Sequence, residues 1–225
     1  MSARKRTAVL ISGRGSNMLA LIEAARSPDY PADIVLVLAN RAEAQGLALA
    51  KERGIATAVI DQKIYAGREE FEKSMQVLLD LHKIELICLA GFMRVLTPAF
   101  VQHWEGRLLN IHPSLLPAYR GLDTHERALA DGVKIHGCTV HFVVPALDEG
   151  PIIAQAAVGV LDSDTPETLA ARVLVQEHII YPAALAAVAG GHVRIKDNRV
   201  IFDQMAPEPP ALRVPADTSS NTRSL

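Results

Sequence analysis

The chain has 225 residues, of which 49% are hydrophobic and 21% charged, and this composition excludes a mostly disordered or a collagen-like protein. Its net charge of −2 and its aromatic content of 4% disfavour a nonspecific nucleic-acid binder. No apolar run approaches the roughly 18 residues of a membrane span, so we expect no membrane association. Cys88 and Cys138 lie far apart in a chain for which we expect no export signal, which favours a reducing, cytoplasmic location without disulfides.

Short apolar runs alternate with amphipathic segments through the first half of the chain. Apolar runs at 8–12, 34–38, 56–60, 84–89 and 108–111 predict buried strands, and helical spacing predicts helices at 17–26, 42–53 and 68–83. Strands and helices in this alternation predict an α/β fold, with a mostly parallel, Rossmann-like sheet covered by helices on both faces. The charged run at 68–73 predicts a solvated helix face.

The second half of the chain has a different pattern. Apolar runs predict strands at 139–144 and 152–160, followed by a long helix at 166–189 and a hairpin at 192–202 that turns at Asp197 and Asn198. No linker interrupts this pattern, so we expect a single domain over residues 1–206. Residues 207–225 are rich in proline and lack aromatic residues, which predicts a disordered C-terminal tail.

A glycine-rich loop, Ser-Gly-Arg-Gly-Ser-Asn at 12–17, separates the first predicted strand from the first predicted helix. Backbone N–H groups at a helix N-terminus in such a loop bind phosphate. Met18 replaces the third glycine of a dinucleotide-binding loop, and Asn40 replaces its acidic ribose ligand. Two interpretations stay open: a site for a single phosphate assisted by Ser16 and Asn17, or a tight turn that caps the helix.

Two polar residues end the strand predicted at 108–111. Asn110 and His112 project from the same side of a strand, at the carboxyl end where parallel sheets bind ligands. An amide can donate to a developing oxyanion and an imidazole can transfer protons. Asp148 lies in a loop between two apolar runs, as either a functional carboxylate or a turn-forming residue. The remaining histidines have no spacing typical of a metal site, so we expect no metal.

These motifs identify a resemblance to the phosphoribosylglycinamide formyltransferases, the folate-dependent transformylases of purine synthesis. The Asn-x-His pair and the later Asp are shared by all folate formyltransferases of this fold, whereas the Gly-Ser-Asn loop and Gly-Leu-Asp-Thr-His select this member. Together the segments span roughly residues 7–203 in the family's order. The matching segments lie at 11–17, 89–96, 109–117, 121–125, 136–141, 147–151 and 176–178.

The resemblance implies a formyltransferase fold and transfer of the formyl group of the co-substrate 10-formyltetrahydrofolate to the primary amine of glycinamide ribonucleotide, by a monomer or a homodimer. It also implies site residues. Gly15, Ser16 and Asn17 would hold the ribonucleotide phosphate, and Glu177 would contact its glycinamide end. Arg68, Met93, Arg94, Val95, Leu96 and Asn110 would contact the folate, and Asn110, His112 and Asp148 would be catalytic.

Two residues depart from the family's pattern, because Asp123 stands where histidine is common and Glu149 where glycine is common. Three other functions are alternatives to formyl transfer to glycinamide ribonucleotide. A formyltetrahydrofolate hydrolase would resemble this chain around 110–112 and 148–151 but lacks the Gly-Ser-Asn loop. A methionyl-tRNA formyltransferase needs a further C-terminal domain. A non-catalytic nucleotide-binding module would leave Asn110, His112 and Asp148 without a task.

Overall fold

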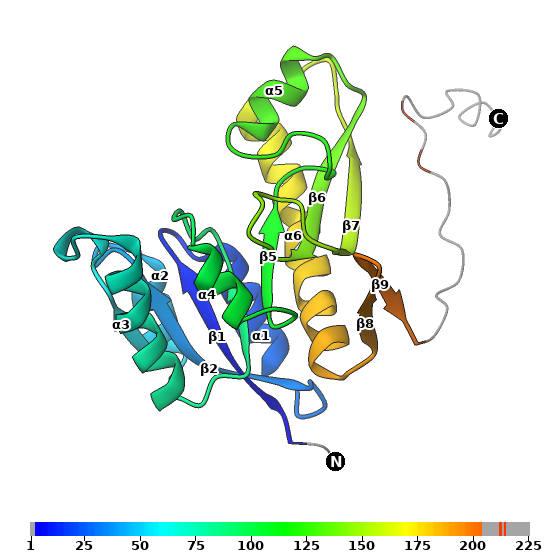
Figure 1. Cartoon of the computed structure of the whole chain (residues 1–225). Coiled ribbons are helices and arrows are strands. Elements are labelled where there is room, and N and C mark those ends of the chain that lie inside the picture. Colours follow the sequence, from blue (N-terminus) through cyan, green and yellow to red (C-terminus); the bar gives the residue numbers. More distant parts are fainter. Residues whose placement is uncertain (1–2, 204–211, 213, 215–225) are drawn as a thin grey trace.

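A seven-stranded sheet runs through the centre of the computed structural model, which describes residues 3–203, 212 and 214 (Figure 1). Its strands are β1 Lys5–Ile11, β2 Ala32–Ala39, β3 Ala56–Val59, β4 Leu86–Leu89, β5 Leu108–His112, β6 Ile135–Phe142 and β7 Ile152–Gly159. They lie in the order β3-β2-β1-β4-β5-β6-β7. The pairs from β3 to β5 are parallel, and β6 pairs antiparallel with β5 and β7. The predicted mostly parallel sheet is confirmed.

Helices follow most of the strands. They are α1 Ser16–Ala25, α2 Gly46–Glu52, α3 Arg68–Leu81, α4 Pro98–His103, α5 Thr124–Ala130 and α6 Pro166–Ala189, with a 3-10 turn at Gln62–Ile64. The predicted hairpin is formed by β8 Val193–Lys196 and β9 Arg199–Phe202. Asp197 and Asn198 turn it with φ of 51° and 57°, a left-handed conformation that asparagine and aspartate tolerate best among residues with a side chain.

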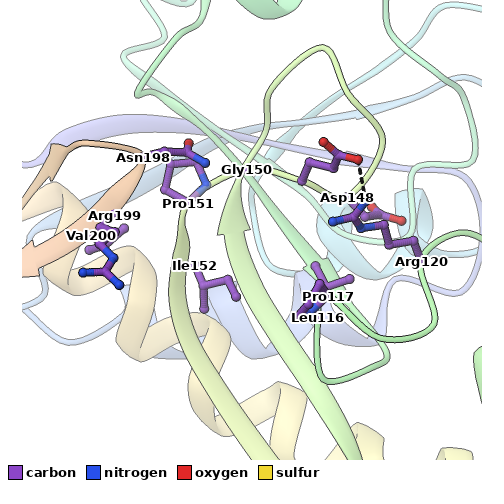
Figure 2. A pocket seen from close by; sticks show the side chains of 11 residues that line it. Leu116, Pro117, Arg120, Asp148, Gly150, Pro151, Ile152, Asn198, Arg199 and Val200 are labelled. Atoms are coloured by element: carbon purple, nitrogen blue, oxygen red, sulfur yellow. Dashed lines mark hydrogen bonds and ion pairs between the residues drawn. The ribbon is translucent and has the colours of Figure 1, made fainter.

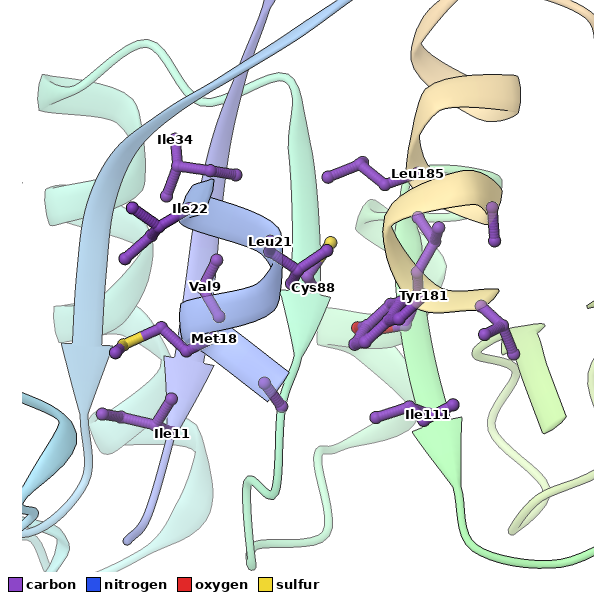
Figure 3. Packing of buried hydrophobic residues seen from close by; sticks show 14 of the residues in the cluster. Val9, Ile11, Met18, Leu21, Ile22, Ile34, Cys88, Ile111, Tyr181 and Leu185 are labelled. Atoms are coloured by element: carbon purple, nitrogen blue, oxygen red, sulfur yellow. The ribbon is translucent and has the colours of Figure 1, made fainter. Parts of the chain in front are cut away.

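The core has two layers, one on each face of the sheet. Alternation along β1 sends Val9 and Ile11 to one layer and Ala8 and Leu10 to the other. In the first layer α1 and α6 pack on the sheet, with Tyr181 of α6 reaching toward β4 and β5 (Figure 3). In the second layer α3 supplies Phe71, Met75 and Leu79, α4 supplies Phe100, and Trp104 follows α4 directly. The predicted coverage of both faces is therefore confirmed.

Figure 3 also shows Cys88 among these apolar side chains. The thiol is completely buried, and burial raises its pKa to about 12. It packs as a small hydrophobic residue.

The helix predicted at 42–53 is wrong at its start, because α2 begins only at Gly46. The Gly46 N–H donates to the Gly13 carbonyl at 3.0 Å, and residues 41–45 form turns before it. A Cβ on Gly46 would stand 2.6 Å from Ile11 Cδ1, so a glycine is needed where α2 approaches the glycine-rich loop. This close approach fixes where the helix begins.

The charged run at 68–73 is not wholly solvated, contrary to the prediction. Glu72 is only 4% exposed and accepts hydrogen bonds from Thr97, one from the backbone N–H at 2.7 Å and one from the hydroxyl. Thr97 in turn caps α4, a six-residue helix that the sequence did not predict. Glu72 is buried because it binds the start of this helix.

The remaining differences concern the second half of the chain. The strand predicted at 139–144 begins at Ile135, because Ile135 and Gly137 already pair with β7. The seven-residue helix α5 was not predicted. Among the described residues no helix has the length and apolar character that a bilayer crossing needs. The predicted disordered tail at 207–225 lies outside the described residues, apart from Leu212 and Val214.

The sheet extends in both directions from β1: β2 and β3 lie on one side of it, and β4 to β7 lie on the other. The boundary between β1 and β4 is therefore the switch point of the sheet. Open α/β sheets bind ligands at the carboxyl ends of strands beside such a switch point. The segments that follow β1, β4 and β5 all leave this edge. They carry the glycine-rich loop, Met93 to Leu96, and His112.

Candidate active site

His112 and Asp148 face one another at the end of β5. The His112 Nδ1 atom lies 3.5 Å from Asp148 Oδ2, and both side chains are more than nine-tenths buried. On the other side of the ring, Nε2 lies 2.9 Å from the Tyr119 carbonyl oxygen. A carbonyl can only accept, so Nε2 carries a proton and Nδ1 is the nitrogen that faces the carboxylate. The structure thus brings together two of the three predicted catalytic residues.

The loop around Asp148 is held in a specific conformation. Asp148 has a φ of 52°, in the left-handed region that few residues with a side chain adopt. Its Oδ2 accepts a hydrogen bond from the Gly121 N–H at 2.9 Å, so the carboxylate is fixed between β5 and the segment that follows it. Strain of this kind is typical of functional sites.

Asn110 is paired with a histidine that the sequence did not predict. Antiparallel pairing of β5 with β6 places His141 opposite Asn110, and Asn110 Nδ2 lies 3.2 Å from His141 Nε2. His141 Nδ1 donates to the Phe142 carbonyl at 2.8 Å, so Nε2 is left as the acceptor for the Asn110 amide. Burial lowers the pKa of His141, which keeps the imidazole neutral.

This pairing orients the Asn110 amide. One Nδ2 hydrogen binds His141, and the second has no partner among the residues that the structure describes, so it can donate to a ligand. His141 Nε2 also lies 3.9 Å from Asp148 Oδ1, so Asn110, His112 and Asp148 form one cluster around His141. His141 is the residue missed by the sequence analysis, and only the register of an antiparallel pair could have identified it.

The glycine-rich loop contacts α6. Gly15 has a φ of 78°, and a Cβ there would stand 3.0 Å from the Gly46 Cα, so both glycines are needed for this approach. Asn17 Nδ2 donates to Glu177 Oε2 at 2.6 Å, and burial raises the pKa of Glu177. Two residues predicted to contact the ribonucleotide therefore contact one another. Asn17 Oδ1 is buried without a hydrogen-bond partner among the described residues.

The segment after β4 presents residues of different exposure. Met93 and Val95 are 60% and 61% exposed, whereas Leu96 is buried in the second core layer. The Arg94 guanidinium lies 4.4 Å from the centre of the Phe71 ring and donates to Gln62 Oε1 at 3.0 Å. Arg68 is exposed at the first residue of α3, the helix that supplies Phe71.

A cavity of about 460 Å³ borders the Asp148 loop (Figure 2). Arg120 and Glu149 form an ion pair on one side of it, and Asn198 and Arg199 of the hairpin lie on the other. Glu149, which departs from the family's pattern, thus links the loop after Asp148 to the segment after His112. Asp123, the other departure, lies in the left-handed region immediately before α5.

The residues of this edge that the structure describes include no group of three or more histidine, cysteine, aspartate or glutamate side chains that could hold a metal ion. The polar groups around His112 are instead amide, imidazole, carboxylate and backbone groups. Such a set can move a proton and stabilise a developing negative charge on oxygen.

The fold and this cluster define a class of group-transfer enzyme, and the sequence pattern of the formyl transferase family matches residues 5–185. The chain belongs to this family. It is 44% identical to the phosphoribosylglycinamide formyltransferase of Escherichia coli (strain K12) over 195 residues, which are 87% of this chain and 92% of that protein.

The chain is also similar to a larger purine biosynthetic protein and to two proteins of known structure. The chain is 50% identical over 195 residues to the human trifunctional purine biosynthetic protein adenosine-3, and it spans only 19% of that protein's length. A glycinamide ribonucleotide transformylase from Symbiobacterium toebii superimposes with a TM-score of 0.87 at 42% identity, covering 90% of this chain and 95% of that chain. A formyltetrahydrofolate deformylase from Pseudomonas syringae superimposes with a TM-score of 0.82 at 26% identity, covering 89% of this chain and 66% of that chain.

Proposed function

We propose that the chain transfers the formyl group of 10-formyltetrahydrofolate to the primary amine of 5′-phosphoribosylglycinamide, giving the N-formyl product and tetrahydrofolate in purine biosynthesis. The observation that carries the proposal is the cluster of Asn110, His112 and Asp148 at the end of β5, at the same sheet edge as the segment after β4 and the glycine-rich loop after β1. Each neighbouring segment then has one substrate to bind. The similarity to phosphoribosylglycinamide formyltransferases across almost their whole length supports this choice.

The reaction needs an amine to add to a carbonyl. The amine nitrogen attacks the formyl carbon, and the carbonyl oxygen takes up the electron pair to become an oxyanion. The free Nδ2 hydrogen of Asn110 donates to that oxyanion, and a protonated His112 places positive charge beside it. The bond from the formyl carbon to the folate nitrogen then breaks, and the carbonyl re-forms.

The reaction also moves one proton from the attacking amine to the leaving folate nitrogen. Asp148 accepts, directly or through a water molecule, the proton that the attacking amine loses, and that proton is delivered to the leaving folate nitrogen. Asp148 Oδ2 also lies 3.5 Å from His112 Nδ1. No covalent enzyme intermediate or metal is part of this scheme.

The binding roles follow from the two segments beside the cluster. Gly15, Ser16 and Asn17 hold the ribonucleotide phosphate at the start of α1, where backbone N–H groups are unpaired. Glu177, held by Asn17, contacts the remainder of that substrate. Met93, Arg94, Val95 and Leu96 line the folate pocket, with Arg68 at its outer side. The enzyme works in the cytoplasm as a monomer or a homodimer.

One assay tests the proposal and separates it from hydrolysis. The purified chain is mixed with 10-formyltetrahydrofolate in the presence and in the absence of glycinamide ribonucleotide. We expect tetrahydrofolate and N-formylglycinamide ribonucleotide to form in equal amounts, and only when the ribonucleotide is present. Release of formate without the ribonucleotide would instead assign the deformylase activity of the more distant structural relative.

A further inference from the structure

Asn40 has no role in the proposed chemistry, yet it is completely buried at the end of β2, beside the switch point of the sheet. In dinucleotide-binding sheets this place holds an acidic ligand. Here both polar atoms of the side chain are hydrogen-bonded within the protein. Asn40 Oδ1 accepts from the Ser12 hydroxyl at 2.7 Å, and Asn40 Nδ2 donates to Gln62 Oε1 at 2.9 Å.

The two ends of this hydrogen-bond chain lie in the segment after β4. The Met93 backbone N–H donates to the Ser12 hydroxyl oxygen at 2.7 Å, and the Arg94 guanidinium donates to Gln62 Oε1 at 3.0 Å. Met93 and Arg94 are therefore held by Ser12, which follows β1, and by Gln62 of the 3-10 turn, and Asn40 joins these two side chains.

The direction of each hydrogen bond in this series is fixed by the donors at its two ends. A backbone N–H and a guanidinium only donate, so Ser12 must accept from Met93 and Gln62 must accept from Arg94. Ser12 then has its hydrogen left for Asn40, and Gln62 Oε1 requires a donor from Asn40. Residue 40 must therefore offer one acceptor and one donor at the same time, which asparagine does and aspartate does not.

We propose that Asn40 is a positioning residue that holds Met93 and Arg94 in the conformation that binds the formyl donor. Glu72 holds the other end of the segment through Thr97, so residues 93–97 are anchored at both ends before any ligand arrives. The inference rests on the proposed function, because it takes this segment as the folate pocket. Its consequence is selective: folate affinity depends on Asn40, and ribonucleotide affinity does not.

Asn40→Asp tests this with almost no change of shape. The carboxylate still accepts from Ser12, but Gln62 must turn its Nε2 toward residue 40 and then faces Arg94 donor to donor. Gln62→Met removes the shared acceptor at a half-buried position. Gln62→Glu keeps that acceptor and is the conservative variant. Gln102→Glu, on the exposed side of α4, is the matched control for an added carboxylate.

The measurement is calorimetric titration of each variant with tetrahydrofolate and with glycinamide ribonucleotide. We expect Asn40→Asp and Gln62→Met to raise the Kd for tetrahydrofolate roughly tenfold, with the Kd for the ribonucleotide unchanged. Gln62→Glu and Gln102→Glu should stay within about twofold of the parent for both ligands.

Three other outcomes are informative. Unchanged tetrahydrofolate binding by both Asn40→Asp and Gln62→Met would overturn the positioning role and leave the proposed function intact. An equal loss of affinity for both ligands would also overturn it, since that pattern reports general damage. A parent chain that binds the ribonucleotide and no tetrahydrofolate would overturn the proposed function, and the positioning role with it.

Discussion

Asp148 is the residue on which the proposed proton transfer depends most directly. Asp148→Asn keeps the shape and the Gly121 hydrogen bond but removes the carboxylate that faces His112 Nδ1. We expect kcat to fall by on the order of 10²–10⁴, the range for one general acid–base group, with smaller changes in the two KM values. Steady-state kinetics measure this, with the exposed Asp29→Asn as control. Turnover within a few-fold of the parent would contradict the assignment.

Asn110 and His141 should act as a unit, because His141 contacts the proposed oxyanion donor and not the oxyanion itself. Asn110→Ala removes that donor and should lower kcat by on the order of 10²–10³. His141→Leu leaves Asn110 present but free to rotate, so it should cost less. In the Asn110→Ala background we expect His141→Leu to cost little more, since the two changes remove one interaction. A double-mutant cycle on kcat tests this, and fully multiplicative losses would disprove the coupling.

The sequence predicts which side chains share one side of a strand, but it does not predict the contacts that they make across the fold. Asn110 and His112 could be assigned to one side of a strand because alternation along a strand is a local property. His141 could not, since its approach to Asn110 depends on the register of β5 and β6. The contact between Asn17 and Glu177 joins residues far apart in the sequence and depends on how α6 packs against α1.

At the scale of elements, a group of aromatic rings joins α5, β6 and the segment after His112. His136 packs against His125 with ring centres 5.2 Å apart and against Tyr119 at 5.8 Å. Burial lowers the pKa of His136 to about 4 and also lowers that of His125. Tyr119 supplies the carbonyl that binds His112, so this packing also supports the site.

This packing predicts a loss of stability in mild acid. An unfolded His136 binds its proton near pH 6.5 and the folded one near 4, so between these values the unfolded chain binds more protons. The free energy of unfolding therefore falls as the pH is lowered through this window, by about 2 kcal/mol from His136 between pH 7 and pH 5. Denaturant unfolding at both pH values measures it. The drop should shrink in His136→Phe and persist in the exposed His192→Gln; equal drops in all three proteins would contradict the prediction.

Elements with a strong local pattern were predicted well, and the short ones were not. The amphipathic helix α3 and the hairpin at Asp197 and Asn198 follow from periodicity and turn residues. Helices α4 and α5 have only six and seven residues, too few for a clear period. The start of α2 depends on the approach of Gly46 to the glycine-rich loop, which is a tertiary contact.

At the scale of the whole molecule, the site results from topology. Parallel strands leave the sheet at one edge, so residues that follow β1, β4 and β5 meet there although they are far apart in the sequence. The antiparallel pair β6 and β7 then brings His141 and the Asp148 loop to the same edge. The sequence predicted the strands in their order along the chain. It could not predict that β6 runs antiparallel to β5 and β7.

Of the residues after 203, Leu212 and Val214 are described, and the Val214 Cγ2 atom stands 3.3 Å from the position that a Cβ on Gly159 would occupy. Gly159 ends β7, whereas the Asp148 loop leads into the start of that strand at Ile152. The contact of Val214 therefore lies at the opposite end of β7 from the Asp148 loop.

We accordingly predict that a chain ending at Met205 keeps its turnover and loses little stability. A half-buried valine contributes at most about 1 kcal/mol, which for a protein of this size is a shift of roughly 2–4 °C in Tm. Calorimetric melting and steady-state kinetics on the truncated and full-length chains measure both quantities, and Val214→Ala in the full chain isolates the contact with β7. A fall of several kcal/mol in the truncated chain but not in Val214→Ala would show that other residues of the segment pack on the domain. A fall in kcat with unchanged Tm would show that the segment reaches the active site.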